Sequence, residues 1–319
     1  SSQVSERALR EIYFPAFEKV VKEAQPKTVM CSYNKINGVY ASENEWLLTK
    51  ILRDEWGFEG FVVSDWYAVS DRVKALKAGL DLEMPGGDRE NDEKIVAAVR
   101  AGELSESVLD EAVERILKVV LDYIDNRRTA KFDRQADHQK AVKIAEECAV
   151  LLKNEGALPL KRGEKVLFIG ELAQKPRYQG GGSSHVNAYS AEGAYCFAEG
   201  YGVSYIKGFG ADGGGTNEER AEAIHAAKNA DKVIVFAGLP DSYESEGYDR
   251  THIDLPECQN LLIKELVESG ANVTVVLHNG SPVAMPWIKD VNAVLEVYLC
   301  GEGVGEATVN LLYGNANPS

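Results

Sequence analysis

The chain has 319 residues, a length typical of two domains, and 45% of them are hydrophobic, which is enough to bury sizeable cores. Its 35 basic and 50 acidic residues give a formal net charge of −15. Such an anionic surface repels phosphate groups, which argues against nucleic acid or an acidic membrane as a partner but not against a neutral ligand such as a sugar.

The first 125 residues predict helices that alternate with short buried strands. Apolar spacing of the helical kind places helices at residues 6–24, 44–57, 71–79, 91–101 and 106–125. Short apolar runs place strands at residues 27–33, 61–66 and 80–86. Asn37-Gly38 predicts a turn. This alternation indicates a parallel sheet that is covered on both faces.

Each of these strands ends in polar or aromatic residues, at Tyr33, Asp65 and Glu83. The carboxyl ends of the strands carry the chemistry in α/β folds. We therefore expect a functional site at this edge of the sheet.

The second half predicts another α/β block. Residues 126–134 are polar and aperiodic and predict a linker, and a long helix is expected over 136–154. The later strands are expected at residues 166–170, 232–238, 272–279 and 293–300, with helices at 217–229 and 257–269. We divide the chain accordingly into a first domain (1–125), a linker with a connecting helix (126–158) and a second domain (159–319).

Asp65 has two interpretations. It follows a buried strand and lies between Ser64 and Trp66, so it could be a carboxylate beside an aromatic platform for a sugar ring. Alternatively, it could cap the next helix or a turn, because Asp is among the commonest N-cap residues.

The segment 239–250 (LPDSYESEGYDR) is a second candidate. It is rich in carboxylates, including Glu244 and Glu246, and contains Tyr243 and Tyr248. It could deliver one carboxylic acid to a pocket, or it could be an acidic loop that merely faces water.

The segment YQGGGSSH (178–185) predicts a tight loop after a strand. Such loops can cradle phosphates, so a nucleotide-binding α/β protein is one alternative. However, neither GxxxxGK[ST] nor a GxGxxG motif that opens a helix is present. A loop that approaches a ligand or another domain is the better interpretation.

The five cysteines are widely spaced and form no CxxC motif. We expect buried free thiols in a reducing compartment, the cytoplasm, rather than disulfides or zinc. The histidines show no paired spacing for a metal, so no metal or cofactor is expected. No apolar stretch approaches the ~18 residues that span a bilayer, and no signal peptide is visible. The chain begins at Ser1 without Met, which we interpret as an internal position.

Several motifs carry a resemblance that covers the chain. They are RALREIYFPAFE, VMCSYNKING, LLTKILRDEWGFEGFVVSDW, AGLDLEMPG, AVLLKNEGALPL, RYQGGGSSH, SEGYDR and CGEGVGEATVNLLYGNANPS. In this order they resemble the β-glucosidases of glycoside hydrolase family 3. The resemblance implies an α/β fold, with the C-terminal strands of a (β/α)8-type barrel, incomplete in this chain, followed by an α/β sandwich domain. It also implies exo-acting hydrolysis of terminal β-D-glucosyl residues with retention, through a covalent glycosyl-aspartate.

The resemblance implies roles for six residues. Asp65 matches the nucleophile of the family's Ser-Asp-Trp motif, and Glu246 matches the general acid/base. The remaining residues line the substrate site by the same resemblance: Met30, Tyr33, Trp66 and Ser183. We further expect the Tyr33 hydroxyl to hydrogen-bond Asp65 and hold its orientation.

The chain departs from the family because roughly five strand–helix units of the barrel would precede the SYN strand. An open sheet edge and exposed apolar surface are therefore expected, and a missing N-terminal barrel segment is an expected partner, as a separate chain or a segment outside this one. The other expected partner is a β-glucoside or a short β-linked oligosaccharide.

Besides the nucleotide-binding protein, two alternatives remain open and one is disfavoured. A β-xylosidase of the same family would have its discriminating residues mostly in the absent segment. A non-catalytic carbohydrate-binding fragment would fit the late start but has no need of both carboxylates. A single-domain N-acetylglucosaminidase of the family is disfavoured because a second domain is present.

Overall fold

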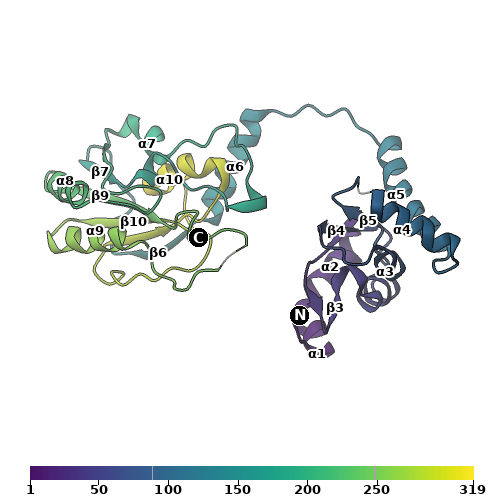
Figure 1. Cartoon of the computed structure of the whole chain (residues 1–319). Helices are drawn as coiled ribbons and strands as arrows, with labels where there is room; N and C mark the ends of the chain where they lie inside the picture. The colour runs from purple at the N-terminus through teal and green to yellow at the C-terminus, as the bar shows by residue number, and fades with distance from the viewer. Residues whose placement is uncertain (88, 248) are drawn as a thin grey trace. The chain divides into compact units, whose positions relative to one another are not determined.

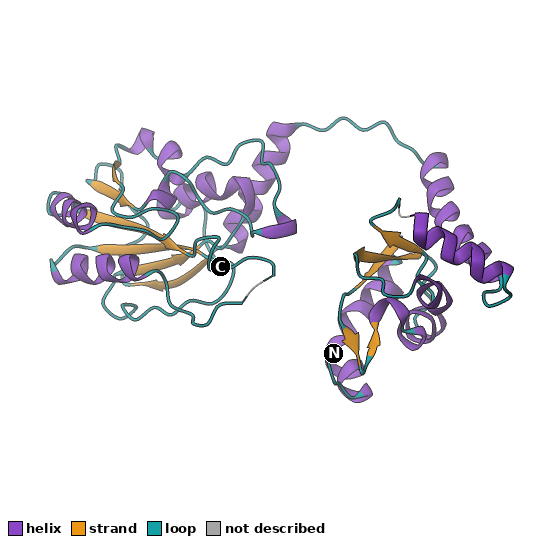
Figure 2. Ribbon diagram, viewed as in Figure 1, coloured by secondary structure: helices purple, strands orange, loops and turns teal. Residues whose placement is uncertain are grey.

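The computed structural model describes residues 1–87, 89–247 and 249–319. The chain divides into two compact units, Ser1–Ala130 and Lys131–Ser319, which we call the first and the second unit (Figure 1). Each unit is an α/β structure with its own sheet (Figure 2). The boundary falls inside the predicted linker, where residues 126–133 form no helix or strand.

The first unit is built on a parallel sheet of β1 (Thr28–Cys31), β4 (Phe61–Trp66) and β5 (Leu82–Met84), in the order β1-β4-β5. Val62 and Ser64 of the central strand are buried, while the alternate residues on the opposite face are only partly buried. All three predicted strands of this unit are confirmed.

The described part of the first unit also contains eight helical segments. They are α1 (Glu6–Ala8), η1 (Leu9–Tyr13), α2 (Pro15–Ala24), η2 (Ala41–Glu43), η3 (Trp46–Glu55), α3 (Arg72–Ala78), α4 (Arg89–Arg100) and α5 (Glu106–Asp125). Apolar residues of η3 and α3, among them Ile51 and Ala75, form one core with Val62. The predicted turn joins β2 (Lys35–Ile36) to β3 (Val39–Tyr40), and both Asn37 and Gly38 have positive φ, as a tight hairpin turn requires.

A buried carboxylate ties this unit together. The side chain of Asp81 is fully buried, and it accepts hydrogen bonds from Arg53 Nη2 at 2.6 Å, Arg115 Nη1 at 2.9 Å and the Val62 amide at 2.7 Å. These donors come from η3, α5 and β4. Because a buried charge is costly unless it is paired, this set of bonds holds three elements in one arrangement.

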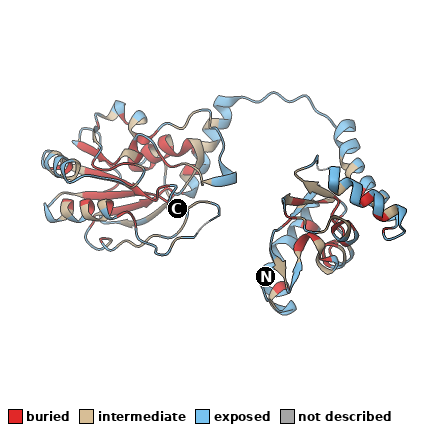
Figure 3. Ribbon diagram, viewed as in Figure 1, coloured by how far each residue is buried: buried red, intermediate tan, exposed pale blue. Residues whose placement is uncertain are grey.

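The second unit contains a six-stranded sheet in the order β6-β11-β10-β9-β7-β8. Its strands are β6 (Val150–Asn154), β7 (Val166–Ile169), β8 (Ser204–Ile206), β9 (Lys232–Gly238), β10 (Val273–His278) and β11 (Ala293–Glu296). All neighbours pair in parallel except β6, which is antiparallel to β11. The central strands are almost wholly buried, as expected of a parallel sheet covered on both faces (Figure 3).

Two hydrophobic cores lie on the opposite faces of this sheet. One packs Phe168, Phe236 and Val276 against residues of α7 (Ala194–Phe197) and α10 (Val304–Leu312). The other packs the alternate strand residues against α8 (Asn217–Ala227) and α9 (Glu257–Glu268). The side chains of each strand alternate between the two cores, which gives the three-layer arrangement of the unit.

The predicted long helix over 136–154 is wrong beyond Cys148. The helix α6 (Arg134–Cys148) ends there, and Ala149 adopts an extended backbone that leads directly into β6. The apolar run Val150-Leu151-Leu152 fits a helix and a strand equally well by itself. Pairing with β11 decides for the strand, which is a tertiary effect that the local pattern does not contain.

Burial of the cysteines is also only partly as expected. Cys31 is buried, but Cys148 and Cys196 are exposed and the other two are partly buried, so the expectation of buried thiols is wrong for that pair. Among the described residues, no helix is both long and apolar enough to cross a lipid bilayer.

We expect Asp81→Ala to lower the free energy of unfolding of the first unit by about 3–5 kcal/mol, because it leaves two partly buried arginines without their shared buried partner. Urea unfolding followed by tryptophan fluorescence measures this unit well, since Trp46, Trp56 and Trp66 lie in it. Glu59→Ala, which breaks an exposed ion pair with Lys118, is the control and should change stability little. Equal unfolding midpoints for the two variants would show that the buried network does not hold the unit together.

Candidate active site

The parallel register of the first unit places two predicted site residues at one edge of its sheet. Cys31 of β1 pairs with Ser64 of β4, so Tyr33 and Asp65 both leave the carboxyl ends of neighbouring strands. The Tyr33 hydroxyl donates a hydrogen bond to Asp65 Oδ1 at 2.9 Å, as expected from the sequence. The same oxygen accepts the Trp66 amide at 2.7 Å. The carboxylate is therefore held in a defined orientation at the strand end.

The alternative that Asp65 caps the next helix is wrong. Asp71 is the N-cap of α3, and its side chain accepts a hydrogen bond from the Lys74 amide at 3.0 Å. Asp65 instead lies on the half-buried face of the sheet, the same face as Val63. Its side chain is available for a role other than capping this helix.

Exposed apolar side chains surround this strand edge. Met30 pairs with Val63 in the register, which puts it on the same face as Asp65, and 60% of its surface is exposed. Trp66 and Tyr33 are also about half exposed. Tyr67, which sequence analysis missed, is 82% exposed and has a φ of 58°. Exposed aromatic faces beside a carboxylate suit the apolar face of a sugar ring.

Glu83, the third predicted strand end, is held by other residues. It forms an ion pair with Arg72 at 3.4 Å and accepts a hydrogen bond from Asn91 Nδ2 at 2.9 Å. These contacts link the end of β5 to α3 and α4, so the structure gives Glu83 a stabilising role.

In the second unit, the predicted residues lie on loops that leave the switch point of the sheet. The next strand in the chain after β7 is β8, which pairs with one side of β7. The strand β9 pairs with the other side of β7, and the later strands lie beyond β9. Loops that leave the carboxyl ends of two such strands diverge and form the usual ligand crevice of an open α/β sheet. The glycine-rich segment follows β7 and the acidic segment 239–250 follows β9.

These two loops are in direct contact. Gly181 forms a β-bridge with Ser245, and the Ser183 amide donates a hydrogen bond to Glu246 Oε2 at 2.7 Å. Gly182 has a φ of +84°, and a Cβ there would come within 2.5 Å of Glu246 Cβ. The glycines are needed for this close approach. The structure thus brings Ser183 to Glu246 through its backbone.

The acidic segment is not a loop that merely faces water. Glu244 is mostly buried, and it accepts hydrogen bonds from the Gly280 amide at 2.7 Å and from the Ser281 hydroxyl. Burial raises the pKa of Glu244, but these bonds and the charge of Arg177 outweigh it and leave the pKa below its ordinary value. Tyr248 lies outside the described residues.

Sequence analysis missed a buried polar group at the ends of β10 and β11. Burial lowers the pKa of His278 to about 4, so its imidazole is neutral at pH 7. Burial raises the pKa of Glu296 to about 7, against the hydrogen bonds that it accepts from the Tyr298 amide and Asn279 Nδ2. A glutamate inside the apolar run AVLEV is the sequence signal that could have indicated this site.

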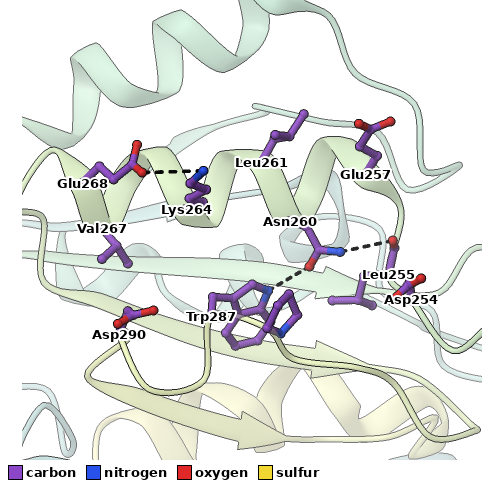
Figure 4. A pocket seen from close by; sticks show the side chains of 11 residues that line it. Asp254, Leu255, Glu257, Asn260, Leu261, Lys264, Val267, Glu268, Trp287 and Asp290 are labelled. Atoms are coloured by element: carbon purple, nitrogen blue, oxygen red, sulfur yellow. Dashed lines mark hydrogen bonds and ion pairs between the residues drawn. The ribbon is translucent and has the colours of Figure 1, made fainter.

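A separate hollow of about 680 Å³ lies on the second unit between α9 and residues 286–290 (Figure 4). Its floor includes Trp287, which is only 4% exposed and donates its indole N–H to Asn260 Oδ1 at 2.8 Å. The buried indole offers no stacking face, and none of the predicted site residues lines this hollow. Within residues 1–87, 89–247 and 249–319, no group of three or more metal-ligating side chains occurs.

An α/β chain whose parallel strands end in an oriented carboxylate beside exposed aromatic residues is typical of enzymes that act on carbohydrates. Residues 149–319 match the glycosyl hydrolase family 3 C-terminal domain, and residues 1–119 match the glycosyl hydrolase family 3 N terminal domain. The chain belongs to glycosyl hydrolase family 3, which confirms the family that the sequence motifs indicate.

The similar proteins include glycosidases of more than one specificity. The chain is 51% identical to thermostable beta-glucosidase B of Acetivibrio thermocellus, over 99% of this chain and 43% of that protein. It is 44% identical to an exo-alpha-(1->6)-L-arabinopyranosidase of Bifidobacterium breve, over 100% of this chain and 44% of that protein. The crystal structure of a Bifidobacterium adolescentis beta-glucosidase of the same family superposes with a TM-score of 0.93 at 43% identity, over 98% of this chain and 47% of that one. The chain thus spans less than half the length of each of these relatives.

We expect Glu296→Gln to stabilise the second unit increasingly as the pH rises from 4.5 to 7. The raised pKa means that the folded state binds the Glu296 proton more tightly than the unfolded state does. The protonated Glu296 side chain therefore contributes its full stability below pH 4.5, and this contribution is lost as the pH rises through about 7. The loss in the free energy of unfolding is about 3 kcal/mol, and a glutamine, which does not ionise, avoids it.

Hydrogen exchange of the β10 and β11 amides at several pH values measures this difference for the second unit alone. Glu268→Gln removes an exposed carboxylate from α9 and serves as the charge-matched control. A difference between Glu296→Gln and wild type that stays constant with pH would contradict the raised pKa.

Proposed function

We propose that this chain supplies the nucleophile and the general acid/base of a retaining, exo-acting β-glycosidase that releases terminal β-D-glucosyl residues from β-glucosides. The observation that carries the proposal is the carboxylate of Asp65, oriented by the Tyr33 hydroxyl at 2.9 Å and flanked by exposed Trp66. Family membership supports a glycosidase rather than a sugar-binding module. The presence of both Asp65 and Glu246 supports it as well, because a binding module has no need of both.

In this mechanism, Asp65 attacks the anomeric carbon and forms a covalent glycosyl ester while Glu246 protonates the departing oxygen. Glu246 then removes a proton from water, which attacks the ester and releases the sugar with retained configuration. Met30, Tyr33 and Trp66 would line the sugar subsite, and Ser183 would support Glu246. No cofactor takes part in this chemistry.

The proposal includes a barrel segment as a partner of the first unit. β1 and β5 are the two edge strands of its sheet, so neither outer edge has a neighbour among the described residues. Beside β1 lies a largely apolar groove of about 480 Å³, and Tyr13, Phe17 and Met30 along it are exposed. Further strand–helix units, on another chain or segment, would cover this surface and complete the sugar site.

The sugar preference is the less defined part of the proposal. A β-xyloside remains an alternative because the discriminating residues would lie in the preceding barrel units. The 44% identity to an exo-alpha-(1->6)-L-arabinopyranosidase adds an arabinopyranoside to the substrates worth testing. A panel of chromogenic β-glucoside, β-xyloside and α-L-arabinopyranoside separates these cases. The cytoplasm stays a prediction from cysteine usage alone.

We expect Asp65→Ala to abolish hydrolysis of an activated aryl β-glucoside, because no covalent intermediate can form. Glu246→Ala should lower kcat roughly 10²–10⁴-fold, because water loses its general base in the second step, and azide should partly rescue it with a β-glucosyl azide as product. The assay uses the chain with the preceding barrel segment supplied. An inactive wild type under these conditions would favour a non-catalytic fragment.

We expect Tyr33→Phe to lower kcat/KM roughly tenfold to a hundredfold, since hydrogen bonds to a charged group contribute about 1.5–3 kcal/mol. Steady-state kinetics with the aryl glucoside measures the effect. Tyr123→Phe removes an equivalent hydroxyl from the exposed surface of α5 and should leave kcat/KM unchanged. A Tyr33→Phe enzyme with wild-type kinetics would show that this hydrogen bond does not orient Asp65 for reaction.

A further inference from the structure

Arg177 is a buried cation that the proposed mechanism does not use. It lies in the loop after β7, with only 8% of its surface exposed. Its guanidinium donates to the acidic segment after β9 at Asp241 Oδ1 (2.9 Å), the Leu239 carbonyl (3.1 Å), the Glu244 carbonyl (3.0 Å) and Glu244 Oε1. A guanidinium is a rigid planar fork, so these bonds fix both the position and the orientation of the segment.

Glu244 is the other half of this anchor. Besides Arg177, its carboxylate accepts the Gly280 amide at 2.7 Å and the Ser281 hydroxyl, both from the turn after β10. Because its pKa is lowered, the carboxylate is ionised at neutral pH and can accept all of these bonds. Glu244 thereby joins the loops that follow three strands, β7, β9 and β10.

Arg250 forms a second anchor on the same turn. Its Nη2 donates to the Ser281 hydroxyl at 3.0 Å and to the Pro282 carbonyl at 2.8 Å. The segment is therefore attached to residues 280–282 on both sides of Glu246, at positions 244 and 250. Ser281 contacts both anchors, which couples them.

We infer that the buried Arg177–Glu244 pair is a positioning unit that holds Glu246 against the glycine-rich loop. Only Ser245 separates Glu246 from the anchored Glu244, and Ser245 itself bridges to Gly181. A Cβ at Gly182 would lie 2.5 Å from Glu246 Cβ, so the two segments are in close approach here. With the anchor in place, Glu246 has one backbone position; without it, the segment loses the contacts that define that position.

This inference deepens the proposed function and rests on it for its kinetic consequence. Displacement of the general acid slows the hydrolysis of a substrate more when its leaving group needs more protonation. Positioning by Arg177 and Glu244 should therefore matter for poor leaving groups and hardly at all for very good ones. A loss of general stability would instead lower the rate for all substrates equally.

The test compares Arg177→Gln, Glu244→Gln and the double variant with wild type, in the chain supplied with the barrel segment. For a phenyl β-glucoside we expect kcat/KM to fall roughly 10- to 100-fold in each single variant. For a dinitrophenyl β-glucoside we expect a fall of less than about threefold. The double variant should be no worse than either single variant, because the two residues act as one unit.

Arg220→Gln is the matched control. It removes an arginine that forms an ion pair with Glu265 at 3.1 Å between α8 and α9, away from the acidic segment, and should affect neither substrate. Equal losses on both glucosides, or additive losses in the double variant, would overturn the positioning role.

Hydrogen exchange of the amides in residues 239–247 gives a readout that needs no activity. Arg177→Gln should raise their exchange rate roughly tenfold or more while the β9 and β10 amides stay as protected as in wild type. Unchanged exchange in this segment would overturn the anchor itself. If wild type hydrolyses no glucoside, the proposed function fails, and the exchange result alone decides on the anchor.

Discussion

The internal arrangement of each unit depends on the parallel register of its strands. In the first unit, the pairing of Cys31 with Ser64 brings the residues just beyond β1 and β4 to one edge, where Tyr33 reaches Asp65. In the second unit, the pairing of β7 with β9 starts two loops side by side, so Gly181 can bridge Ser245. A shift of one residue would turn every side chain to the opposite face and separate these contacts.

Hydrogen bonds to buried charged groups hold helices and loops in place where strand pairing does not. Asp81 joins η3, α5 and β4 through two arginines and one amide, and Arg177 joins the loops after β7 and β9 through four bonds. Taking a charge out of water is costly, and only a nearly complete set of partners offsets that cost. Arrangements that lack one partner are therefore disfavoured, which makes these groups a source of a unique geometry.

The errors in the sequence interpretation have more than one cause. The run Val150-Leu151-Leu152 continued a helical pattern, and only its pairing with β11 shows that it is an edge strand. β8, a strand of three residues, was missed because it is too short to show a period of its own. Cys148 was expected in the interior, yet it is exposed at the last position of α6. Only for Val150-Leu151-Leu152 did a neighbour distant in sequence outweigh the local signal.

The sequence by itself determined the α/β class, all three strands of the first unit, most strands of the second, and the family, because these follow from local periodicity and short motifs. It also indicated Asp65 and Glu246 as carboxylates at strand ends and loops. The tertiary structure confirms the expected bond from Tyr33 to Asp65, and it adds two contacts that the sequence did not indicate, from Ser183 to Glu246 and from Arg177 to Glu244. These partners are 32, 63 and 67 residues apart, and no local pattern specifies contacts over such separations, because they depend on how the strands pair.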